Sequence, residues 1–476
     1  METKKLTSRL KIDMVVNTVP HDISGVCCHT KEVRDGCVFV CIKGANCDGH
    51  DFAKQAVQKG AKMVVCQKPL DLDVCQIVVK DTHKAMSVLS SAWHDYPAQK
   101  LKIICVVGTN GKTSVATLIY KIMSQCGYKC ALVSTNGIYI DGKYIDNDMT
   151  TPDPMVLNRL WADMVACDTK FCIMEMSAHA IHQQKTFGNV VDVAVFTNLS
   201  QDHLDYFGDM DSYAKTKTSF FDRQYTKIAV VNSDDKVGQQ LIKDNKIPTV
   251  SFGITNVADV FAIDINCDGQ TSCFVVNLYD EVCRFCCKMP GIFNVYNLLA
   301  SATVCRIFGV KAKQIAMALK DIEGVEGRNE TVFLPDGTKA VVDYAHTPDG
   351  FKNILSHLKK STKGKLICVF GCGGNRDKTK RKIMGQVSSQ YCDFVFVTSD
   401  NPRFEDPFEI MFDVQSGLSV SHKLVCNRKD AIKQALDMAK SGDTVAILGK
   451  GHEKYQEING AKYPFCDMDV VLGYTK

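Results

Sequence analysis

Short apolar runs that alternate with stretches of helical period dominate the chain from Leu101 onward. The first runs are LKIICVVG, KCALVST, KFCIMEMS, DVAVFTNL and KIAVVNSDD. Strands that are apolar on both faces are typical of a parallel sheet covered by helices, because only such a sheet buries both of its faces. The pattern therefore predicts an α/β fold built on a parallel sheet.

The alternation changes character along the chain. Residues 255–290 alternate polar and apolar positions, which predicts an antiparallel hairpin or edge sheet. After Gly327 the first pattern resumes in KAVVDYAH, KLICVFGCGG, DFVFVTSDNPR and TVAILGKGHE. Before Leu101, CVFVCIKG and AKMVVCQK predict a small α/β domain, which WHDYPAQK links to the rest. A chain of 476 residues suits about three domains, which we place at residues 1–98, 99–326 and 327–476.

The composition is that of a globular protein and excludes several classes of function. Hydrophobic residues make up 45% of the chain, and a net charge of +4 is too small to argue for a nucleic-acid or membrane partner, although small anionic substrates remain open. The N-terminus lacks the apolar core of a signal peptide, and no run approaches the ~18 apolar residues of a membrane-spanning helix. We therefore expect a cytoplasmic protein.

Cysteine is frequent, with 23 residues, many of them within apolar runs where they act as small buried hydrophobic side chains. Such use fits a reducing compartment. Cys283 and Cys286 have the spacing of a metal-ligand pair, and Cys267, Cys273 and Cys287 are near them, but a second well-spaced pair is missing. We expect free thiols on strands here, with a zinc site as the alternative.

The segment Gly108-Thr109-Asn110-Gly111-Lys112-Thr113 lies between the first apolar run and a helical stretch. Backbone N–H groups at the start of a helix point into such a turn and favour an anion. Lys112 would contact the outer phosphates of a nucleoside triphosphate, and the Thr113 hydroxyl would ligate Mg²⁺. The loop is shorter than the usual phosphate-binding loop, since Val106 stands where that loop has its first glycine. An ordinary glycine turn is the alternative.

Polar residues follow two further strands of the predicted central sheet. Glu175 ends KFCIMEMS, and His203 follows DVAVFTNL beside Asp202 and Asp205. Ligands gather at the carboxyl ends of parallel strands, so we expect Glu175, His203 and the phosphate loop to share one edge. A carboxylate and an imidazole there could hold a metal beside the phosphates. A capping or core histidine is the alternative for His203.

An ordered series of motifs extends over nearly the whole chain. It consists of GTNGKT, MTTPDP, EMSAHAIHQQK, FTNLSQDHLDYFGDMDSYAKTK, GIFNVYN, VVDYAHTPD, FGCGGNRDKTKR, SDNPR and GKGHE. In this order the motifs resemble the Mur ligase family, and within it the branch that adds the third residue of the peptidoglycan stem peptide. The resemblance implies a small N-terminal α/β domain for a uridine nucleotide, a central phosphate-loop ATPase domain whose parallel sheet carries added antiparallel strands, and a C-terminal Rossmann-like domain for the incoming amino acid.

The resemblance also implies the reaction, an ATP-dependent amide-bond ligation in cytoplasmic peptidoglycan precursor synthesis. ATP would convert the carboxylate of UDP-N-acetylmuramoyl-L-alanyl-D-glutamate into an acyl phosphate, which the amine of meso-diaminopimelate would attack. L-Lysine is the alternative amino acid. A folylpolyglutamate synthetase, which shares the short phosphate loop, is the alternative ligase, and a non-catalytic nucleotide-binding module is the alternative outside the enzymes. We expect a monomer that binds no nucleic acid.

Site residues are carried over from the family by motif. The ATP-binding residues are Gly108, Thr109, Asn110, Gly111, Lys112, Thr113, Ser114, Asn294, Asn297, Arg328, Asp343 and His346. Two Mg²⁺ ions would be held by Thr113, Glu175, His203 and carbamylated Lys217, and Lys112, Lys217 and His203 are the catalytic residues. Reaction with CO₂ turns a neutral lysine amine into an anion that can hold Mg²⁺. For Lys217 an exposed helix lysine is the alternative, and for Asn294 and Asn297 it is helix N-capping.

The resemblance also assigns the two remaining substrates. The nucleotide dipeptide would be held by Ser24, Thr150, Thr151, Ser177, Gln183 and Lys185. The amino acid would meet Arg376, Asp400, Asn401, Pro402, Arg403, Gly449 and Glu453, which follow strands of the last domain. An Arg can hold each carboxylate and Glu453 can accept from an ammonium, which suits a zwitterion with an extra carboxylate.

Three positions depart from the family pattern. Lys185 replaces the usual Arg, so a point charge replaces a two-pronged contact. Cys28-His29-Thr30 replaces an Asp-Ser-Arg signature in the region that reads the uracil. Asn375 stands where an Asp is common. The Asp-Asn-Pro-Arg run that ends at Arg403 nevertheless resembles the members of the family that add diaminopimelate.

Overall fold

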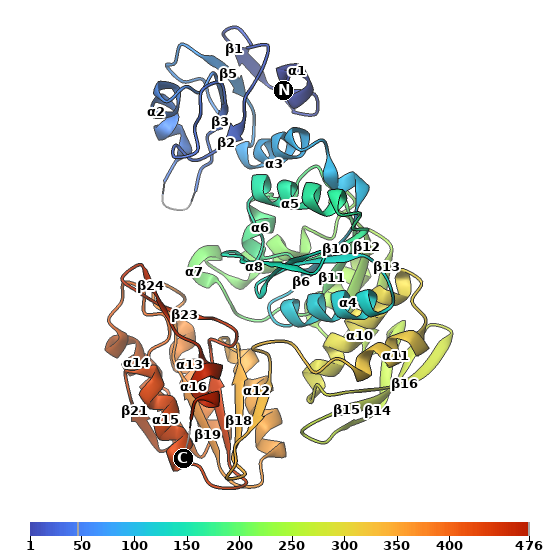
Figure 1. Cartoon of the computed structure of the whole chain (residues 1–476), viewed down its shortest axis with the longest axis vertical. Helices are drawn as coiled ribbons and strands as arrows, with labels where there is room; N and C mark the ends of the chain where they lie inside the picture. The colour runs from blue at the N-terminus through green and yellow to red at the C-terminus, as the bar shows by residue number, and fades with distance from the viewer. Residues whose placement is uncertain (45–46, 475–476) are drawn as a thin grey trace.

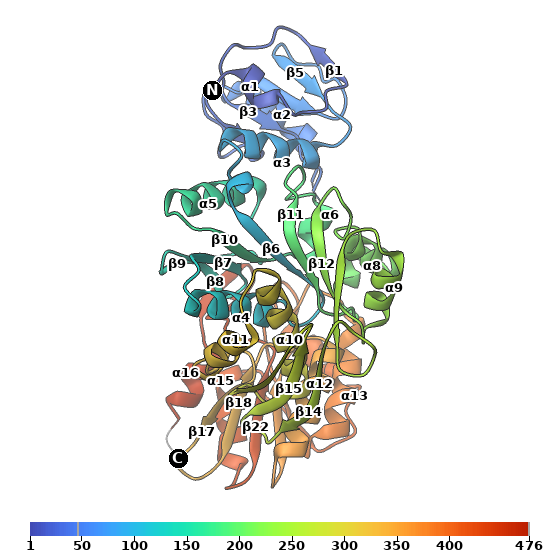
Figure 2. The same ribbon diagram turned by 90° about the vertical axis from the view of Figure 1, so that its right-hand side faces the viewer.

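Three sheets follow one another along the long axis of the molecule in the computed structural model, which describes residues 1–44 and 47–474 (Figure 1, Figure 2). The N-terminal sheet has five strands in the order β1-β5-β4-β3-β2, and only β1 runs antiparallel to its neighbour. Its elements are α1 (Thr3–Thr7), β1 (Met14–Val16), β2 (Val26–Cys27), β3 (Val38–Val40), α2 (Ala53–Gln58), β4 (Met63–Cys66), β5 (Cys75–Val78) and α3 (Thr82–Trp93). The predicted linker contains the end of α3 and a short 3₁₀ helix, Pro97–Lys100.

The central sheet has eleven strands in the order β16-β15-β14-β13-β12-β11-β6-β10-β7-β8-β9. Its strands are β6 (Lys102–Val107), β7 (Cys130–Ser134), β8 (Gly137–Ile140), β9 (Lys143–Ile145), β10 (Phe171–Glu175), β11 (Val191–Phe196), β12 (Thr226–Asn232), β13 (Thr249–Gly253), β14 (Val260–Cys267), β15 (Ser272–Leu278) and β16 (Glu281–Cys287). Its helices are α4 (Lys112–Gln125), α5 (Pro154–Ala166), α6 (Ala178–His182), α7 (Leu204–Phe207), α8 (Met210–Thr218), α9 (Lys236–Asp244), α10 (Ile292–Ile307) and α11 (Ala312–Lys320).

The strand order places the ligand-binding edge of the central sheet. The parallel strands β10 and β11 lie on opposite sides of β6, so the chain reverses its direction of winding at β6. Crevices outside the carboxyl ends of strands form at such a reversal. The antiparallel strands β14 to β16 extend the sheet at one end, which confirms the antiparallel segment expected over residues 255–290.

The C-terminal sheet has six strands in the order β17-β18-β22-β19-β20-β21, parallel except for β17. Its strands, together with a separate hairpin of β23 and β24, are β17 (Glu330–Phe333), β18 (Lys339–Asp343), β19 (Leu366–Phe370), β20 (Phe394–Val397), β21 (His422–Leu424), β22 (Thr444–Leu448), β23 (Tyr455–Ile458) and β24 (Ala461–Pro464). Its helices are α12 (Pro348–Ser361), α13 (Thr379–Tyr391), α14 (Pro407–Gln415), α15 (Arg428–Met438) and α16 (Asp467–Leu472).

Helices cover both faces of the two larger sheets, as the doubly apolar strands require. Helices α4, α10 and α11 pack on one face of the central sheet, and α5 with α6 on the other. In the C-terminal sheet, α12, α13 and α14 cover one face, while α15 and α16 cover the other. The predicted α/β fold class is confirmed. The domain boundaries at residues 98 and 326 stay a prediction.

The cysteines of β15 and β16 differ from the prediction. Cys273 and Cys286 are direct partners in the antiparallel register and form a disulfide bond, so the expectation of free thiols is wrong for this pair. Directly opposed side chains in an antiparallel pair have adjacent Cβ atoms, a relationship that sequence spacing does not reveal. Within the described residues, no group of three or more His, Cys, Asp or Glu side chains could hold a metal ion by itself.

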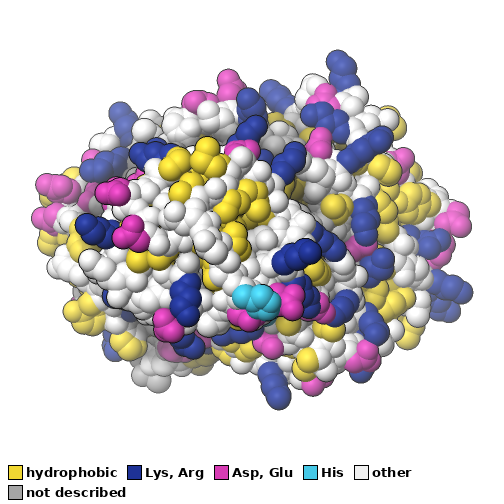
Figure 3. All heavy atoms as spheres, turned by 90° about the horizontal axis from the view of Figure 1, so that it is seen from above, with side chains coloured by type: hydrophobic (Ala, Val, Ile, Leu, Met, Phe, Trp, Pro, Cys, Tyr) yellow, Lys and Arg dark blue, Asp and Glu magenta, His cyan; other side chains and the backbone are white. Residues whose placement is uncertain are grey.

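The surface carries mixed charge, in line with the net charge of +4. Seen from the N-terminal end, Lys and Arg side chains are interspersed with Asp and Glu side chains (Figure 3). Among the helices of the described residues, none is long and apolar enough to cross a membrane.

Candidate active site

One cavity of about 1120 Å³ lies between the central and C-terminal sheets. The predicted residues that line it are Thr109, Asn110, Gly111, Lys112, Thr113, Ser114, Thr150, Glu175, Ser177, His203, Lys217, Asn294, Asn297, Arg328, Asp343, His346, Arg376, Arg403 and Glu453. The predicted residues that do not line it are Ser24, Gly108, Thr151, Gln183, Lys185, Asp400, Asn401, Pro402 and Gly449. Residues expected to meet ATP, metal and amino acid thus surround a single space.

The phosphate loop connects β6 to the first turn of α4. Gly108 has a φ of 154°, and a Cβ at this position would overlap the hydroxyl of Thr197 on the neighbouring strand end. Gly111 is the N-cap of α4, so the free N–H groups of the first turn face the cavity. Lys112 Nζ donates to the carbonyl oxygens of Gly108 and Thr109 at 3.0 and 2.9 Å. The loop therefore presents a cation and backbone donors to one place, as an anion site requires.

The expected metal ligands come from three elements that meet beside this loop. Glu175 is buried at the end of β10, and its Oε1 accepts from the backbone N–H of Thr135 at 2.7 Å. Burial lowers the pKa of His203 to about 3, so its imidazole is neutral and can donate a lone pair. Lys217 of α8 is 1% exposed. Burial, with the charge of Lys112 added, holds the pKa of Lys217 well below its usual value.

These side chains fit the chemistry of a carbamate and of Mg²⁺. Only an unprotonated amine reacts with CO₂, and a buried lysine with a lowered pKa supplies one. A neutral imidazole, a carboxylate and the Thr113 hydroxyl are donors that a hard cation accepts when phosphate oxygens complete its shell.

Arg328 joins the two large sheets at the phosphate loop. Its Nη2 donates to Thr113 Oγ1 at 2.9 Å, and its guanidinium lies over the ring of Tyr344, 4.3 Å from the centroid. Asp343, at the end of β18, accepts from the backbone N–H groups of Asn329 and Ala345 at 2.7 and 2.6 Å. Burial raises the pKa of Asp343.

The two asparagines of α10 face the same cavity. Asn294 Nδ2 donates to the carbonyl of Pro290 at 2.9 Å, and Asn297 Nδ2 donates to Asn294 Oδ1 at 3.2 Å. The N-cap of α10 is Gly291, so neither asparagine caps the helix through its side chain. The N-capping alternative is therefore wrong for both.

Of the six residues expected to hold the nucleotide dipeptide, Thr150 and Ser177 line the cavity. Thr151 Oγ1 donates to the carbonyl of Glu175 at 2.9 Å and accepts from the N–H of Ser177 at 3.0 Å. Lys185 pairs with Asp153 at 2.8 Å and is buried. Its charge is thus neutralised within the protein. Burial raises the pKa of the nearby Cys28 thiol to about 12. Ser24 is exposed and donates to Asp35 O at 2.6 Å, and Gln183 is the C-cap of α6.

The expected amino-acid pocket lies at the carboxyl edge of the C-terminal sheet. Arg376 is exposed and lines the cavity. Arg403 Nε pairs with Glu457 of β23 at 3.0 Å, and its Nη1 donates to the carbonyl of Gly374 at 2.9 Å. Asn375 accepts from the N–H of Phe404 at 3.1 Å and so ties two of the loops together.

Two residues of this pocket were missed from the sequence, Lys450 and Glu457. Lys450 is fully buried, and its Nζ lies 2.7 Å from Glu453 Oε2 and 3.5 Å from Asp400 Oδ1. Asn401 Nδ2 also donates to Glu453, at 2.9 Å. The signal that the sequence offered for Lys450 was its position two residues after the buried strand β22. Glu457 lies on a hairpin of mixed polarity and gave no signal.

Family models match the chain in succession. The model described as Mur ligase family, catalytic domain, matches residues 22–102. The Mur ligase middle domain matches residues 106–305, and the Mur ligase glutamate ligase domain matches residues 327–451.

Similar proteins match over the full length. A Clostridium acetobutylicum protein named UDP-N-acetylmuramoyl-L-alanyl-D-glutamate--2,6-diaminopimelate ligase 1 is 37% identical over 100% of this chain and 99% of its own. A ligase of the same kind from Geobacillus kaustophilus is 39% identical over 96% and 95% of the two chains. The solved structure of a UDP-N-acetylmuramoyl-L-alanyl-D-glutamate--2,6-diaminopimelate ligase, 30% identical, has a TM-score of 0.70 and covers 99% of this chain and 98% of its own. The chain belongs to the Mur ligase family.

Proposed function

We propose that the protein is an ATP-dependent ligase that joins meso-diaminopimelate to UDP-N-acetylmuramoyl-L-alanyl-D-glutamate in the cytoplasm. One observation carries the proposal: Lys112 of the phosphate loop and the arginines Arg376 and Arg403 line the same cavity. A space that can hold a triphosphate beside an acidic amino acid suits the joining of a carboxylate to an amine. The named ligases that match the chain end to end support the same substrates.

The reaction needs ATP because a carboxylate is a poor electrophile. A carboxylate oxygen of the dipeptide attacks the γ-phosphorus, the bond from that phosphorus to ADP breaks, and an acyl phosphate forms. The unprotonated amine of the amino acid then attacks the acyl carbon. The tetrahedral intermediate expels inorganic phosphate, and the amide keeps the new carbon–nitrogen bond while the amine proton leaves to solvent.

The chain's own groups hold the reacting phosphates. The N–H groups of the first turn of α4 and the Lys112 ammonium would bind the triphosphate and neutralise charge as the γ-phosphoryl group moves. Arg328 reaches the same place from the C-terminal side. Thr113, Glu175, His203 and Lys217, as a carbamate, would hold Mg²⁺, which supplies further charge neutralisation to the phosphates.

Side chains at the carboxyl edge of the C-terminal sheet would determine which amino acid binds. Arg403 would exchange Glu457 for a substrate carboxylate, since both offer the same two oxygens to its guanidinium. Glu453, fixed by Lys450 and Asn401, would accept from a substrate ammonium. L-Lysine lacks the second carboxylate and would leave one arginine without a partner. Meso-diaminopimelate therefore suits the pocket better than L-lysine does.

The test is phosphate release from ATP by the purified protein with UDP-N-acetylmuramoyl-L-alanyl-D-glutamate and each amino acid in turn. We expect release that requires both the nucleotide dipeptide and meso-diaminopimelate. Release with L-lysine instead would mean that the added amino acid is L-lysine, while the proposed type of reaction would stand. Release only with a folate and glutamate, or no release with any acceptor, would overturn the proposed substrates.

A further inference from the structure

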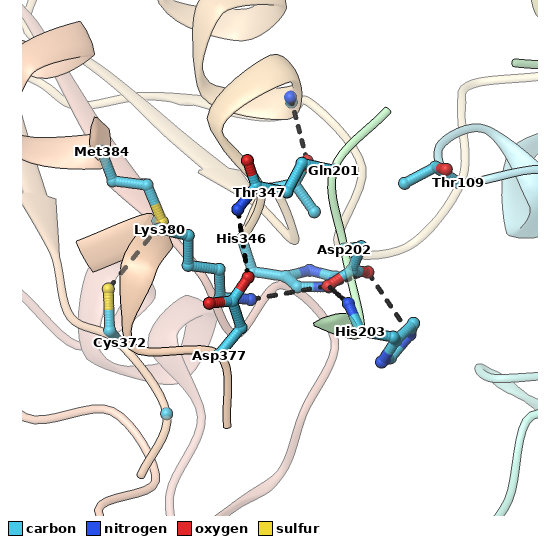
Figure 4. Close-up of polar contacts among 12 residues, drawn as sticks. Thr109, Gln201, Asp202, His203, His346, Thr347, Cys372, Asp377, Lys380 and Met384 are labelled. Carbon is cyan, nitrogen blue, oxygen red and sulfur yellow. Dashed lines mark hydrogen bonds and ion pairs between the residues drawn. The ribbon is translucent and has the colours of Figure 1, made fainter. Parts of the chain in front are cut away.

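Asp202 lies at a junction between the central and C-terminal sheets. Its side chain is 8% exposed, and three cations or imidazoles surround it: His203 at 3.3 Å, Lys380 at 3.6 Å and His346 at 3.7 Å (Figure 4). His203 belongs to the central part of the chain, whereas His346 and Lys380 come from the loop after β18 and from α13. The carboxylate thus connects residues more than a hundred positions apart.

Asp202 also fixes the backbone of His203. Its Oδ1 accepts from the backbone N–H of His203 at 3.0 Å. His203 has a φ of 55°, in the left-handed region, where a residue with a side chain persists only when its surroundings hold it. The Asp202 carboxylate is therefore part of what directs the imidazole of His203 into the cavity.

The helix that carries Lys380 does not explain why this cation is buried. It lies in the first turn of α13, where a cation opposes the helix dipole, and that turn contains no acidic residue. Its side chain is 9% exposed, so its charge has lost most of its water, which is costly unless a partner compensates. Lys378, two residues earlier, is exposed and pairs with Glu405, in a loop of the same C-terminal part of the chain. Lys380 instead pairs across the junction.

A second set of contacts beside Lys380 also joins the central part of the chain to the start of α13. Gln201 Nε2 donates to Asp377 Oδ2 at 3.2 Å and to Thr379 Oγ1 at 3.0 Å. Asp377 in turn accepts from the N–H of Thr379 at 2.9 Å, which fixes the start of α13. Neighbouring residues 201 and 202 are thus both held by the start of one helix of the other sheet.

We propose that Lys380 is a positioning residue: by pairing with Asp202 it holds the backbone of His203, and so makes the phosphate site complete only when the C-terminal sheet is seated against the central one. The inference rests on the proposed ligase function. Lys380 does not line the cavity, so it acts through Asp202 rather than on a substrate.

The variant Lys380→Met removes the charge and keeps most of the volume. We expect kcat to fall about 10- to 100-fold, the loss typical of a misplaced catalytic group. KM for ATP and for the nucleotide dipeptide should change by less than about threefold, because no substrate contact is removed. Lys380→Arg keeps a cation at this place and should retain more kcat than Lys380→Met. Lys382→Met, at an exposed position of the same helix, is the matched control and should behave as the wild type.

Hydrogen–deuterium exchange separates positioning from general stability. Lys380→Met should speed exchange in residues 199–208, and Lys382→Met should not. A lower melting temperature with unchanged exchange in that segment, or a kcat equal to that of Lys382→Met, would overturn the inference. A higher KM at unchanged kcat would overturn it as well, since it would mean direct contact with substrate.

A double variant tests whether Lys380 acts through Asp202. Adding Lys380→Met to Asp202→Asn should lower kcat by less than about twofold beyond Asp202→Asn alone, because the two residues share one effect. Independent losses that multiply would contradict the inference. If the wild type shows no acceptor-dependent phosphate release, the ligase proposal fails, while the exchange of residues 199–208 still decides whether Lys380 holds the loop.

Discussion

The amine of Lys217 lies over the ring of Tyr213, with its Nζ 4.5 Å from the ring centroid. Tyr213 and Lys217 are one turn apart on α8, and both side chains are buried. No carboxylate among the described residues forms an ion pair with Lys217. A lysine in such a place stays neutral more readily than an exposed one, because burial penalises its charged form.

The carbamylation proposed for Lys217 would make activity depend on dissolved CO₂. We expect enzyme prepared and assayed in CO₂-free buffer to lose most of its activity and to regain it when bicarbonate is added. Lys217→Arg, which cannot form a stable carbamate, should be inactive with or without bicarbonate. Phosphate release measures both. Equal activity of the wild type in the two buffers would contradict this role.

Much of the fold could be predicted because its strands are apolar on both faces. β6, β7, β10, β11 and β12 all coincide with apolar runs, and their order along the chain predicts a parallel sheet. Shorter strands were missed. β9, β23 and β24 are partly or fully exposed and lack a clear period, and β8 is mostly buried but only four residues long. The hairpin of β23 and β24 did carry a signal, the Asn459-Gly460 pair, whose φ values of 49° and 77° suit a tight hairpin turn.

For the site, the sequence could predict individual residues at the ends of strands but not the contacts between them. Glu175 ends a strand, and His203 and Arg403 follow strands, a placement that the sequence alone reveals. The sequence does not reveal the partners that fix these three side chains. Glu457 pairs with Arg403 from a hairpin 54 positions later in the chain. Lys380 pairs with Asp202, which lies 178 positions earlier. Such pairs depend on how segments far apart in the chain pack together, which no local pattern encodes.

Partly buried His357 should make the protein less stable in mild acid. Burial, with Lys339 and Lys360 nearby, lowers the pKa of His357 from 6.5 to about 4. The unfolded chain therefore binds the proton more tightly between these values, so stability rises with pH across this window and falls as pH drops below about 6.5. Lowering pH from about 7.5 to about 5 should cost about 1–2 kcal/mol at this residue.

The measurement is the urea midpoint at the two pH values. His357→Gln cannot bind the proton and should show a smaller loss between them than the wild type does. His29→Gln, at an exposed position, should keep the wild-type loss. A His357→Gln protein with the full wild-type pH dependence would assign the effect to other groups.

Removing the carboxylate of Asp467 should destabilise the C-terminal sheet strongly. Arg428 donates to Asp467 through Nε and Nη2, both at 2.7 Å, and neither side chain is exposed. Asp467→Asn leaves a buried cation without its partner, which costs about 3–5 kcal/mol. Urea unfolding measures the loss. Asp469→Asn, exposed on the same helix, should change stability by about 0.5 kcal/mol or less. Equal midpoints for the two variants would contradict the assigned role.

Arg403 should decide which amino acid is used. Loss of a charge-assisted hydrogen-bond pair costs about 1.5–3 kcal/mol, so Arg403→Ala should raise KM for meso-diaminopimelate about 10- to 100-fold and leave KM for the nucleotide dipeptide near the wild-type value. Glu457→Gln weakens the internal partner of Arg403 and should lower KM for meso-diaminopimelate. Phe404→Ala, at an exposed neighbour, is the control. Equal changes in both KM values, or none, would show that Arg403 does not hold the amino acid.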